Sequence, residues 1–307
     1  LIYYVVYSFT DNFSGDILAG TNGSGVFRST DNGDSWTQTG LTNNNVFSLA
    51  IDFGGDIFAG TDNGIYRSTD NGDNWIQTGL TSTNVSSLAI KTWGYIFAGT
   101  YDGWIYDGVY RSTNNGYNWT AINNGLTNTD ITTLAVNYNG DILVSTYGGG
   151  VFRSTDNGDN WTAINNGLTS TYIYFIAVNA SGNFFVETWT GLFRSTDNGI
   201  SWTDINSAFT NYFVNSLGFN NNSDIFAGTG GGVFRSTDNG VSWAASNYGL
   251  TNTFIYSLLI NPSGDIFAGL YYGGIFISTD NGDNWTQTSL PNFFVASLAI
   301  NASGDIF

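Results

Sequence analysis

Short apolar runs alternate with turns rich in Gly and Asn along the whole chain, and the same order of runs returns about every 40 residues. In the second copy the runs are 46–51 (VFSLAI), 56–61 (DIFAGT), 64–68 (GIYRS) and 75–78 (WIQT). Short runs rich in β-branched and aromatic residues predict strands, and no segment keeps a helical period. Each copy therefore predicts four strands.

The first run of each copy has apolar side chains on both of its faces. In the second copy, Val46 and Ala50 point to one face, and the other face carries Phe47, Leu49 and Ile51. A strand with one wet face would alternate polar and apolar residues, so this pattern indicates a sheet covered on both faces. Stacked four-stranded sheets of this kind are typical of β-propeller blades.

One eight-residue string, which we call the box, marks the period. Ser-Thr-Asp-Asn-Gly-x-x-Trp, or a close copy, occurs seven times, and its Trp residues lie 39 to 44 positions apart. We therefore predict an all-β fold, a seven-bladed β-propeller of four-stranded antiparallel blades with a surplus partial repeat at the C-terminus. The repeats of this single domain, 1–307, are expected at about 4–43, 44–82, 83–128, 129–170, 171–210, 211–252 and 253–292, with the partial repeat at 293–307.

Both ends of the chain carry a first-strand pattern. Residues 4–16 supply the first strand of repeat one, and residues 294–307 supply another first strand and the start of a second strand. Three roles are open for this C-terminal segment. It can close the ring by replacing or pairing with the N-terminal strand, it can pair with a neighbouring molecule, or it can begin an eighth blade. Contacts between neighbours that do not close would give a filament. The apolar residues of this candidate assembly strand are Phe294, Val295, Leu298 and Ile300.

The box resembles the Asp-box, also called the bacterial neuraminidase repeat, and the resemblance covers essentially the whole chain. It implies a propeller with each box in the hairpin between the third and fourth strands of a blade. Sialidases, sortilin-type receptors, some glucanases and photosystem assembly factors share the motif, so it predicts the fold and not the function. The matching box residues are Asp31, Asp70, Asn114, Asp156, Asp197, Asp238 and Asp280, and Trp36, Trp75, Trp119, Trp161, Trp202, Trp243 and Trp285.

A structural role for the boxes follows from their residue types. Asp can accept backbone N–H bonds across a tight turn, Gly can supply a positive φ, and Trp can cover the outer end of a blade. Pairs such as Asp31 and Asp34 also bring two carboxylates together, but the loop lacks the length and the bidentate Glu of a calcium loop. We therefore expect no metal.

Composition excludes several kinds of chemistry. The net charge is −17, and the only cations are six Arg and Lys91, so neither nucleic acid nor an anionic membrane surface is an expected partner. No apolar run is long enough for membrane insertion. The chain has no His and no Cys, which excludes Ser–His and Cys–His nucleophile pairs.

The acidic and basic residues form no evident catalytic set. Glycoside hydrolysis usually needs two carboxylates, but Glu187 is the only Glu and nearly all Asp residues belong to repeated turns. All six Arg residues directly precede a box, so we expect each to serve its own blade. We predict no enzyme and no cofactor. Isolated departures from the repeat, expected at the surface, are Glu187, Lys91 and Trp93.

Aromatic residues outside the repeat mark a candidate ligand or partner face. In propellers generally, the loops between second and third strands share one face with the connections from one blade to the next. Exposed rings there can stack on sugars, contact a protein, or pack the loops onto the rim. The loops between second and third strands hold Tyr101, Trp104, Tyr106, Tyr147, Trp189, Tyr271 and Tyr272. The connections from one blade to the next carry Tyr172, Tyr212, Phe254, Phe293 and Phe294.

These observations predict a non-enzymatic, secreted or cell-surface structural or interaction protein, with bacterial-type secretion. Its expected partners are itself, in a homo-oligomer or an extracellular filament built through the chain-end strands, or other surface proteins. The alternative is a carbohydrate-binding propeller that uses the aromatic loops on glycans. A glycoside hydrolase is the remote alternative.

Overall fold

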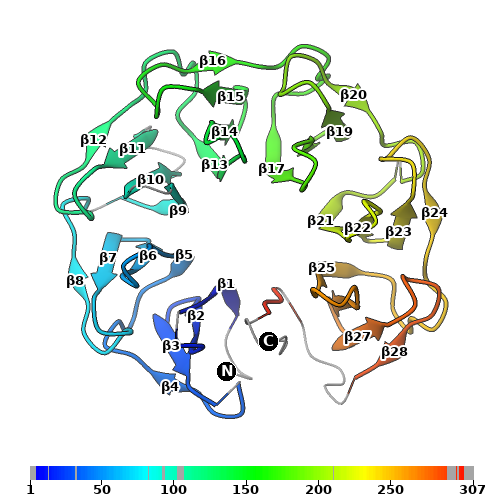
Figure 1. The fold of residues 1–307 in the computed structure, drawn as a ribbon, viewed down its shortest axis with the longest axis horizontal. Coiled ribbons are helices and arrows are strands. Elements are labelled where there is room, and N and C mark those ends of the chain that lie inside the picture. The colour runs from blue at the N-terminus through cyan, green and yellow to red at the C-terminus, as the bar shows by residue number, and fades with distance from the viewer. Residues whose placement is uncertain are drawn as a thin grey trace. The chain divides into compact units, whose positions relative to one another are not determined.

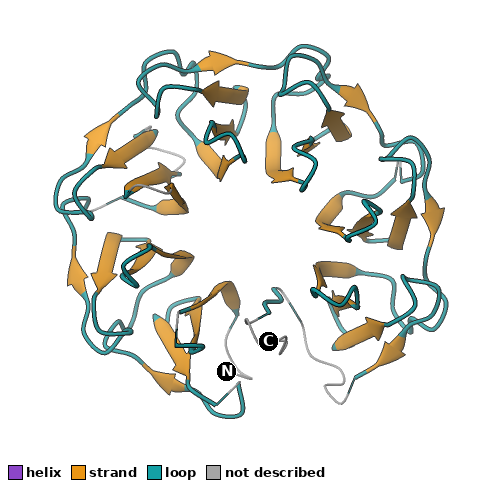
Figure 2. Ribbon diagram, viewed as in Figure 1, coloured by secondary structure: helices purple, strands orange, loops and turns teal. Residues whose placement is uncertain are grey.

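The structure, a computed structural model, describes residues 5–288 except 13, 32, 82, 92–93, 102–106 and 210, together with residues 295 and 297–300. In this part of the chain, 28 strands form seven four-stranded sheets and there is no helix (Figures 1 and 2). The protein is a seven-bladed β-propeller, which confirms the predicted fold class. The described residues include no helix long and apolar enough to cross a membrane.

The strands of each blade follow chain order from first to fourth. Blades 1 to 4 consist of β1 (Val6–Asp11), β2 (Ile17–Thr21), β3 (Val26–Ser29), β4 (Thr37–Gln38), β5 (Val46–Ile51), β6 (Ile57–Thr61), β7 (Gly64–Ser68), β8 (Ile76–Gln77), β9 (Val85–Lys91), β10 (Tyr95–Thr100), β11 (Val109–Ser112), β12 (Thr120–Ala121), β13 (Ile131–Val136), β14 (Ile142–Thr146), β15 (Gly150–Ser154) and β16 (Thr162–Ala163). Blades 5 to 7 consist of β17 (Ile173–Val178), β18 (Phe184–Thr188), β19 (Gly191–Ser195), β20 (Thr203–Asp204), β21 (Val214–Phe219), β22 (Ile225–Thr229), β23 (Gly232–Ser236), β24 (Ala244–Ala245), β25 (Ile255–Ile260), β26 (Ile266–Leu270), β27 (Ile275–Ser278) and β28 (Thr286–Gln287).

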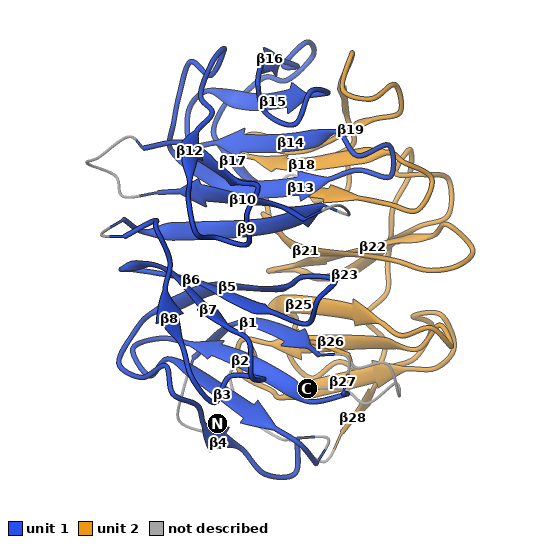
Figure 3. Cartoon of the chain, turned by 60° about the vertical axis from the view of Figure 1, so that its left-hand side comes forward, with its two compact units in different colours: residues 1–176 blue, residues 177–307 orange. Residues whose placement is uncertain are grey.

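The chain divides into two compact units, residues 1–176 and 177–307 (Figure 3). Unit 1 holds blades 1 to 4 and unit 2 holds blades 6 and 7, while the boundary falls within β17 of blade 5. In each unit the first strands of successive blades pack against one another.

Burial explains why the four strands of a blade differ in sequence. All residues of β6 are buried, because a second strand lies between two partners and is covered on both faces. Both residues of the fourth strand β8 are exposed at the sheet edge. In this repeat the first and third strands have the predicted bounds, but the fourth is only Ile76–Gln77. The Thr78 N–H still donates to Ile65 O of the third strand at 2.8 Å, and the next N–H, that of Gly79, donates to Gly116 O in the next box at 3.3 Å.

A β-bulge recurs in the first strand. In blade 2, Val46 pairs with Thr61 and Ser48 with Gly60, so Phe47 is an extra residue in the strand. The same shift occurs in blades 1, 3, 4, 6 and 7. A bulge re-aims the side chain of the extra residue.

Neighbouring blades of a unit interlock where a first strand meets the preceding blade. A Cβ added to Gly60 would lie 2.8 Å from Cγ1 of Val85, the first residue of the first strand of blade 3. We call such a position a glycine socket where it holds Gly, because an added side chain there would meet the first strand of the next blade. Gly20 receives Val46 in this way, Gly99 receives Ile131, and Gly228 receives Ile255.

A hydroxyl in the first strand makes a second contact between blades. Ser48 Oγ accepts the N–H of Leu88 in the next blade at 3.1 Å. This bond satisfies a backbone donor that the sheet leaves free. The same bond joins Ser8 to Leu49, Ser87 to Leu134, and Ser216 to Leu258.

The C-terminal segment docks on blade 7 in the same manner. Val295 is 8% exposed, its N–H donates to Leu270 O at 3.0 Å, and its Cγ1 lies 2.5 Å from a Cβ added to Gly269. Val295 therefore fills the glycine socket of blade 7 as Ile255 fills that of blade 6. Of the other candidate assembly residues, Leu298 and Ile300 are half-buried and Phe294 lies outside the described residues.

Candidate functional site

Each box closes the hairpin between the third and fourth strands of its blade through side-chain hydrogen bonds. In blade 7, Ser278 Oγ accepts the Gly282 N–H at 2.8 Å and Asp280 Oδ1 accepts the Asn284 N–H at 2.9 Å. Asn281 has a φ of 62°, in the left-handed region that Asn tolerates. In the other six boxes, the equivalent side-chain oxygen accepts the backbone N–H of the residue four positions later. These side chains belong to Asp31, Asp70, Asn114, Asp156, Asp197 and Asp238.

Hydrogen bonds lower the pKa of the first acid in six of the boxes, whereas the third box has Asn114 at this position. The side chain of Asn160 lowers the pKa of Asp156 to about 2, and the Ser201 side chain does the same for Asp197. The second acid serves another blade, since Asp159 pairs with Arg111 at 2.7 Å. Among the described residues no group of three or more His, Cys, Asp or Glu is placed to hold a metal ion.

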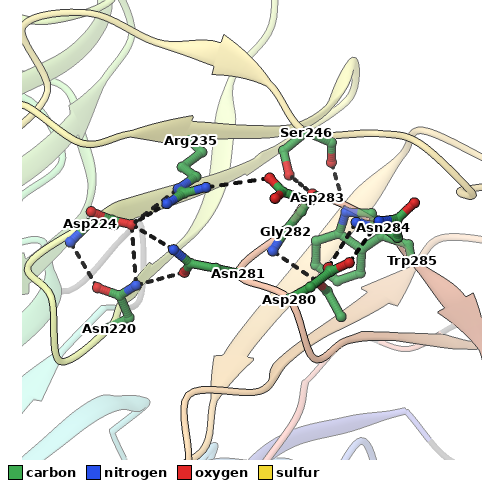
Figure 4. A network of polar contacts seen from close by, with 11 residues as sticks. Asn220, Asp224, Arg235, Ser246, Asp280, Asn281, Gly282, Asp283, Asn284 and Trp285 are labelled. Carbon is green, nitrogen blue, oxygen red and sulfur yellow. Dashed lines mark hydrogen bonds and ion pairs between the residues drawn. The ribbon is translucent and has the colours of Figure 1, made fainter.

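The Arg residues before the boxes join one blade to the box of the next (Figure 4). Arg235 Nε and Nη2 donate to Asp224 Oδ2 at 3.1 and 2.8 Å, and Arg235 Nη1 lies 3.5 Å from Asp283 Oδ1 in blade 7. Burial raises the pKa of Asp224, but hydrogen bonds from Asn281 and Arg235 lower it further than burial raises it. The expectation that each Arg serves only its own blade is wrong, because the next box is also contacted by Arg28, Arg111 and Arg194.

The box Trp binds the preceding blade. Trp285 is 4% exposed, and its indole N–H donates to Ser246 O of blade 6 at 2.8 Å (Figure 4). Trp36 instead donates to Gly33 O of its own box. Trp202 is as buried as Trp285, with 5% of its side chain exposed. Bonds to the preceding blade are also made by Trp75 to Thr39, Trp119 to Thr78, Trp161 to Ile122, and Trp243 to Ile205.

Two departures from the repeat contact a neighbouring blade, and the expectation that they lie at the surface is wrong for Glu187, which is buried. Glu187 is 1% exposed at the strand position that Gly60 holds in blade 2, and its Oε1 accepts the Val214 N–H at 3.0 Å. Burial raises the pKa of Glu187 to about 8. Lys91 is half-buried, and its ammonium donates to Asn157 Oδ1 of the next box at 2.6 Å.

The loops at the opposite end of the blades carry the predicted aromatic residues. In unit 1, Tyr101 follows β10, Tyr147 follows β14, and Tyr172 precedes β17. The ring centroid of Tyr147 lies 6.4 Å from that of Tyr101 and 5.0 Å from that of Tyr172, and both ring pairs meet edge to face. The three rings are 40% to 48% exposed. They form one aromatic patch over the loop after β10, the loop after β14 and the connection from β16 to β17.

A buried carboxyl adjoins this patch. Tyr147 N–H donates to the backbone oxygen of Asp130 at 2.9 Å, and the Asp130 side chain is nearly buried. Its Oδ1 has no hydrogen-bond partner among the described residues, and burial raises the pKa of Asp130. Buried polar atoms are normally paired, so this oxygen is an exception, and burial keeps it from solvent.

A second aromatic cluster lies in unit 2, around the loop after β26. The ring centroid of Tyr271 lies 5.3 Å from that of Phe254, 6.3 Å from that of Tyr256 and 4.5 Å from that of Tyr272. Tyr272 is 62% exposed. A hydrogen bond with the Tyr272 side chain raises the pKa of Tyr271.

Trp189 belongs to a smaller cluster of the same unit. It is 63% exposed, and its ring centroid lies 5.9 Å from that of Phe213. The neighbouring Tyr212 covers the loop after β22, where a Cβ added to Gly231 would meet Cε2 of its ring at 2.5 Å. Tyr212 can therefore lie over this loop only because the loop has Gly there.

The structure thus divides the predicted face into separate clusters. It brings Tyr101 and Tyr147 together, and Tyr271 and Tyr272 together, with Trp189 in a third place. Sequence reasoning missed Phe213 and Tyr256. Tyr256 was detectable, because it stands at the bulge position that Phe47 holds in blade 2. The remaining aromatic predictions, Trp93, Trp104 and Tyr106, lie outside the described residues.

Comparison with known proteins shows the fold alone. No family profile and no curated protein matches the sequence. The extracellular domain of a putative hybrid two-component system from B. thetaiotaomicron is similar in structure, with TM-score 0.71, 22% identity, and coverage of 90% of this chain and 38% of that one. A GH74 xyloglucanase from Xanthomonas campestris has TM-score 0.69, 15% identity, and coverage of 94% and 54%. YCF48 from Cyanidioschyzon merolae has TM-score 0.64, 16% identity, and coverage of 86% and 92%. The chain therefore spans well under two thirds of the first two proteins.

Proposed function

We propose that this chain is a non-enzymatic, secreted or cell-surface interaction protein whose aromatic loop end binds its partners, and that its repeats belong to the Asp-box group. The observation that carries the proposal is the set of exposed rings that contact one another at one end of the blades, with Trp189 at 63% and Tyr272 at 62% exposure. Exposed aromatic clusters are typical of interaction sites. An extracellular location, reached by bacterial-type secretion, agrees with the extracellular domain among the similar structures.

The non-enzymatic part of the proposal rests on the available side chains. The chain has no His and no Cys, and its only Glu is buried between blades with Oε1 held by Val214 N–H. A pair of carboxylates that flanks a glycosidic bond would need a second acid beside an accessible first one. We expect no turnover on a panel of sialosides and β-glucans, and measurable hydrolysis of any of them would overturn this part.

Carbohydrate binding is the second candidate function. The rings of Tyr101, Tyr147 and Tyr172 contact one another and are 40% to 48% exposed, so they are accessible to a ligand. The aromatic rings would then stack on the apolar faces of sugar rings. Similarity to a xyloglucanase fits this candidate at the level of the fold.

A matched pair of variants tests the proposal. We expect the double variant Trp189→Ala and Tyr272→Ala to lose binding to protein extracted from the producing cell surface, and to keep its circular dichroism spectrum. The control is Tyr138→Ala, because Tyr138 is 99% exposed in the turn between β13 and β14, at the other end of the blade. Equal binding by both variants would contradict the proposal. Binding to a glycan array that Tyr147→Ala abolishes would favour the second candidate.

A further inference from the structure

Two acidic positions of the repeat supply a carboxylate to the Arg residue that precedes a box. For Arg235 these are Asp224, at the end of the turn before the second strand of its own blade, and Asp283, the second acid of the next box (Figure 4). We call them the turn acid and the box acid. The other ion pairs use the turn acid, Arg67 with Asp56 and Arg153 with Asp141, or the box acid, Arg28 with Asp73 and Arg111 with Asp159.

The Arg residue of blade 5, Arg194, is the one Arg for which the sequence has lost both acids. Asn183 stands at the turn position, and Val241 stands at the box position of the next blade. In the other blades a loss at one position is matched by an acid at the other. Tyr117 replaces only the box acid of blade 2's Arg, and Tyr95 replaces only the turn acid of blade 3's Arg.

The contacts of Arg194 agree with this loss. Arg194 is half-buried, and within the described part of the chain it has no ion pair and donates one hydrogen bond, from Nη1 to Asn239 O in the next box. Its Nε is buried without a partner among these residues, whereas Arg235 Nε donates to Asp224. The Asn183 amide donates to Asn239 Oδ1 at 3.3 Å. Arg194 thus lacks the carboxylate that each other Arg has.

The residues around the missing box acid are exposed. Val241 is 68% exposed and has no group that could pair with the guanidinium. Thr203 is exposed and pairs with Arg194 across β19 and β20. Directly paired residues of neighbouring strands lie on the same face of the sheet, so the Thr203 hydroxyl is a second donor beside the guanidinium. This place is therefore accessible to a carboxylate that comes from outside the chain.

We propose that Arg194 is a docking site for an acidic side chain of a partner protein, whose carboxylate takes the place that Asp283 holds beside Arg235. The repeat identifies the occupant, because blades that keep the box acid fill this place with the Asp side chain of a neighbouring hairpin. Arg donates to a carboxylate through a planar fork of N–H groups, which fixes the direction of approach.

The charge of the chain makes such a contact selective. With a net charge of −17, the chain repels an acidic partner except where a cation has no acid of its own. A contact of this kind sets orientation more than affinity. The site lies at the box end of the blades, so the inference goes beyond the proposed function of the aromatic loops, and its test does not involve them.

The Arg side chains can be observed directly, because six Arg residues give at most six Nε–H signals in a nitrogen–proton correlation spectrum. The probe is a blocked peptide, acetyl-Gly-Asp-Gly-amide, and its control carries Asn in place of Asp. At an ionic strength of about 0.15 M, charges more than roughly 8 Å apart are screened. We expect the Asp peptide to shift one signal saturably, the other Arg signals to stay in place, and the Asn peptide to have no effect.

Variants that restore an acid assign the signal and test the site. In Val241→Asp and Asn183→Asp the chain's own carboxylate occupies the guanidinium, so both variants should displace the same signal and abolish its response to the peptide. Val241→Asn has nearly the same shape without the charge, and it should respond as the unmodified chain does.

Three results would overturn the proposal. The first is the absence of any saturable shift, or an equal shift of all Arg signals. The second is a response that persists unchanged in Val241→Asp. The third is tighter binding of galacturonate than of the Asp peptide, because the carboxylate would then come from an acidic sugar and not from a protein.

Discussion

At the scale of single residues, the positions where the repeat changes carry most of the chemistry. Glu187 replaces the glycine of a socket and brings a carboxyl into the seam between blades 5 and 6, next to Val214. Hydrogen bonds lower the pKa of box carboxylates such as Asp156, in this case to about 2. These two kinds of acid have opposite effects on the pH dependence of stability.

Glu187→Gln is expected to stabilise the protein at neutral pH. The folded pKa of Glu187, about 8, lies above its ordinary value of 4.5. The folded state is therefore favoured while Glu187 is protonated, below pH 4.5, and this stability is lost as the pH rises towards 8. The linkage is worth at most roughly 3 kcal/mol at pH 7. Denaturant unfolding should show that the loss of stability between pH 5 and 8.5 disappears in the variant.

Glu187→Gly is the matched control, because it restores the residue of the other sockets and is also uncharged. A pH dependence above 5 that persists in both variants would assign the effect to another group. Below pH 4 the sign reverses. The box carboxylates stabilise the fold only while ionised, so their contribution is lost as the pH falls towards 2 in all three proteins.

The burial of Glu187 could not be predicted from its residue type, because a lone Glu is almost always exposed. The signal was its place in the repeat, in the same column as Gly60 and Gly228. Lys91 is similar, since it stands where other turns have Asn or Asp and its ammonium reaches the next box. For these two residues, the position within the repeat predicts the surroundings of the side chain better than the residue type does.

At the scale of elements, the register between blades depends on the fit of one first-strand residue into one socket. The bulge in the first strand re-aims its extra residue, and the socket glycine of the preceding blade admits the residue before the bulge. The sequence predicted the bounds of β5 and β7 because alternation and turn residues are local properties. It overestimated β8, which is only two residues long, and it could not show that the Gly79 N–H binds a neighbouring box, because that contact is not a local property.

Gly228→Ala is expected to destabilise the protein, whereas Gly230→Ala should have little effect. A Cβ at position 228 would lie 2.7 Å from Cγ2 of Ile255, but at position 230 its nearest neighbour would be an atom of Tyr212 at 3.4 Å. Overpacking of this kind costs about 1–3 kcal/mol. The free energies of unfolding of the two variants, two positions apart, provide the measurement. Equal values would mean that blades 6 and 7 can separate enough to admit a methyl group.

At the scale of the molecule, stability comes from contacts between successive blades as in other repeat proteins. The contacts between blades are made by the Trp and acidic residues of the boxes, by the Arg residues before them and by the socket glycines. The same residues therefore explain both the repeat in the sequence and the stacking of the blades. The sequence predicted the seven blades from this period. It could not group the aromatic residues, because the clusters join loops that are far apart along the chain, as Tyr101 and Tyr147 are.

Association between copies is expected to increase with salt. Every copy has a net charge of −17, so copies repel one another at low ionic strength. Raising the ionic strength from about 0.01 to about 0.15 M shortens the screening length from roughly 30 to roughly 8 Å, while apolar contacts between copies are not weakened. The native mass from light scattering should therefore rise across this range. A mass that falls with salt would instead mean that ion pairs hold the copies together.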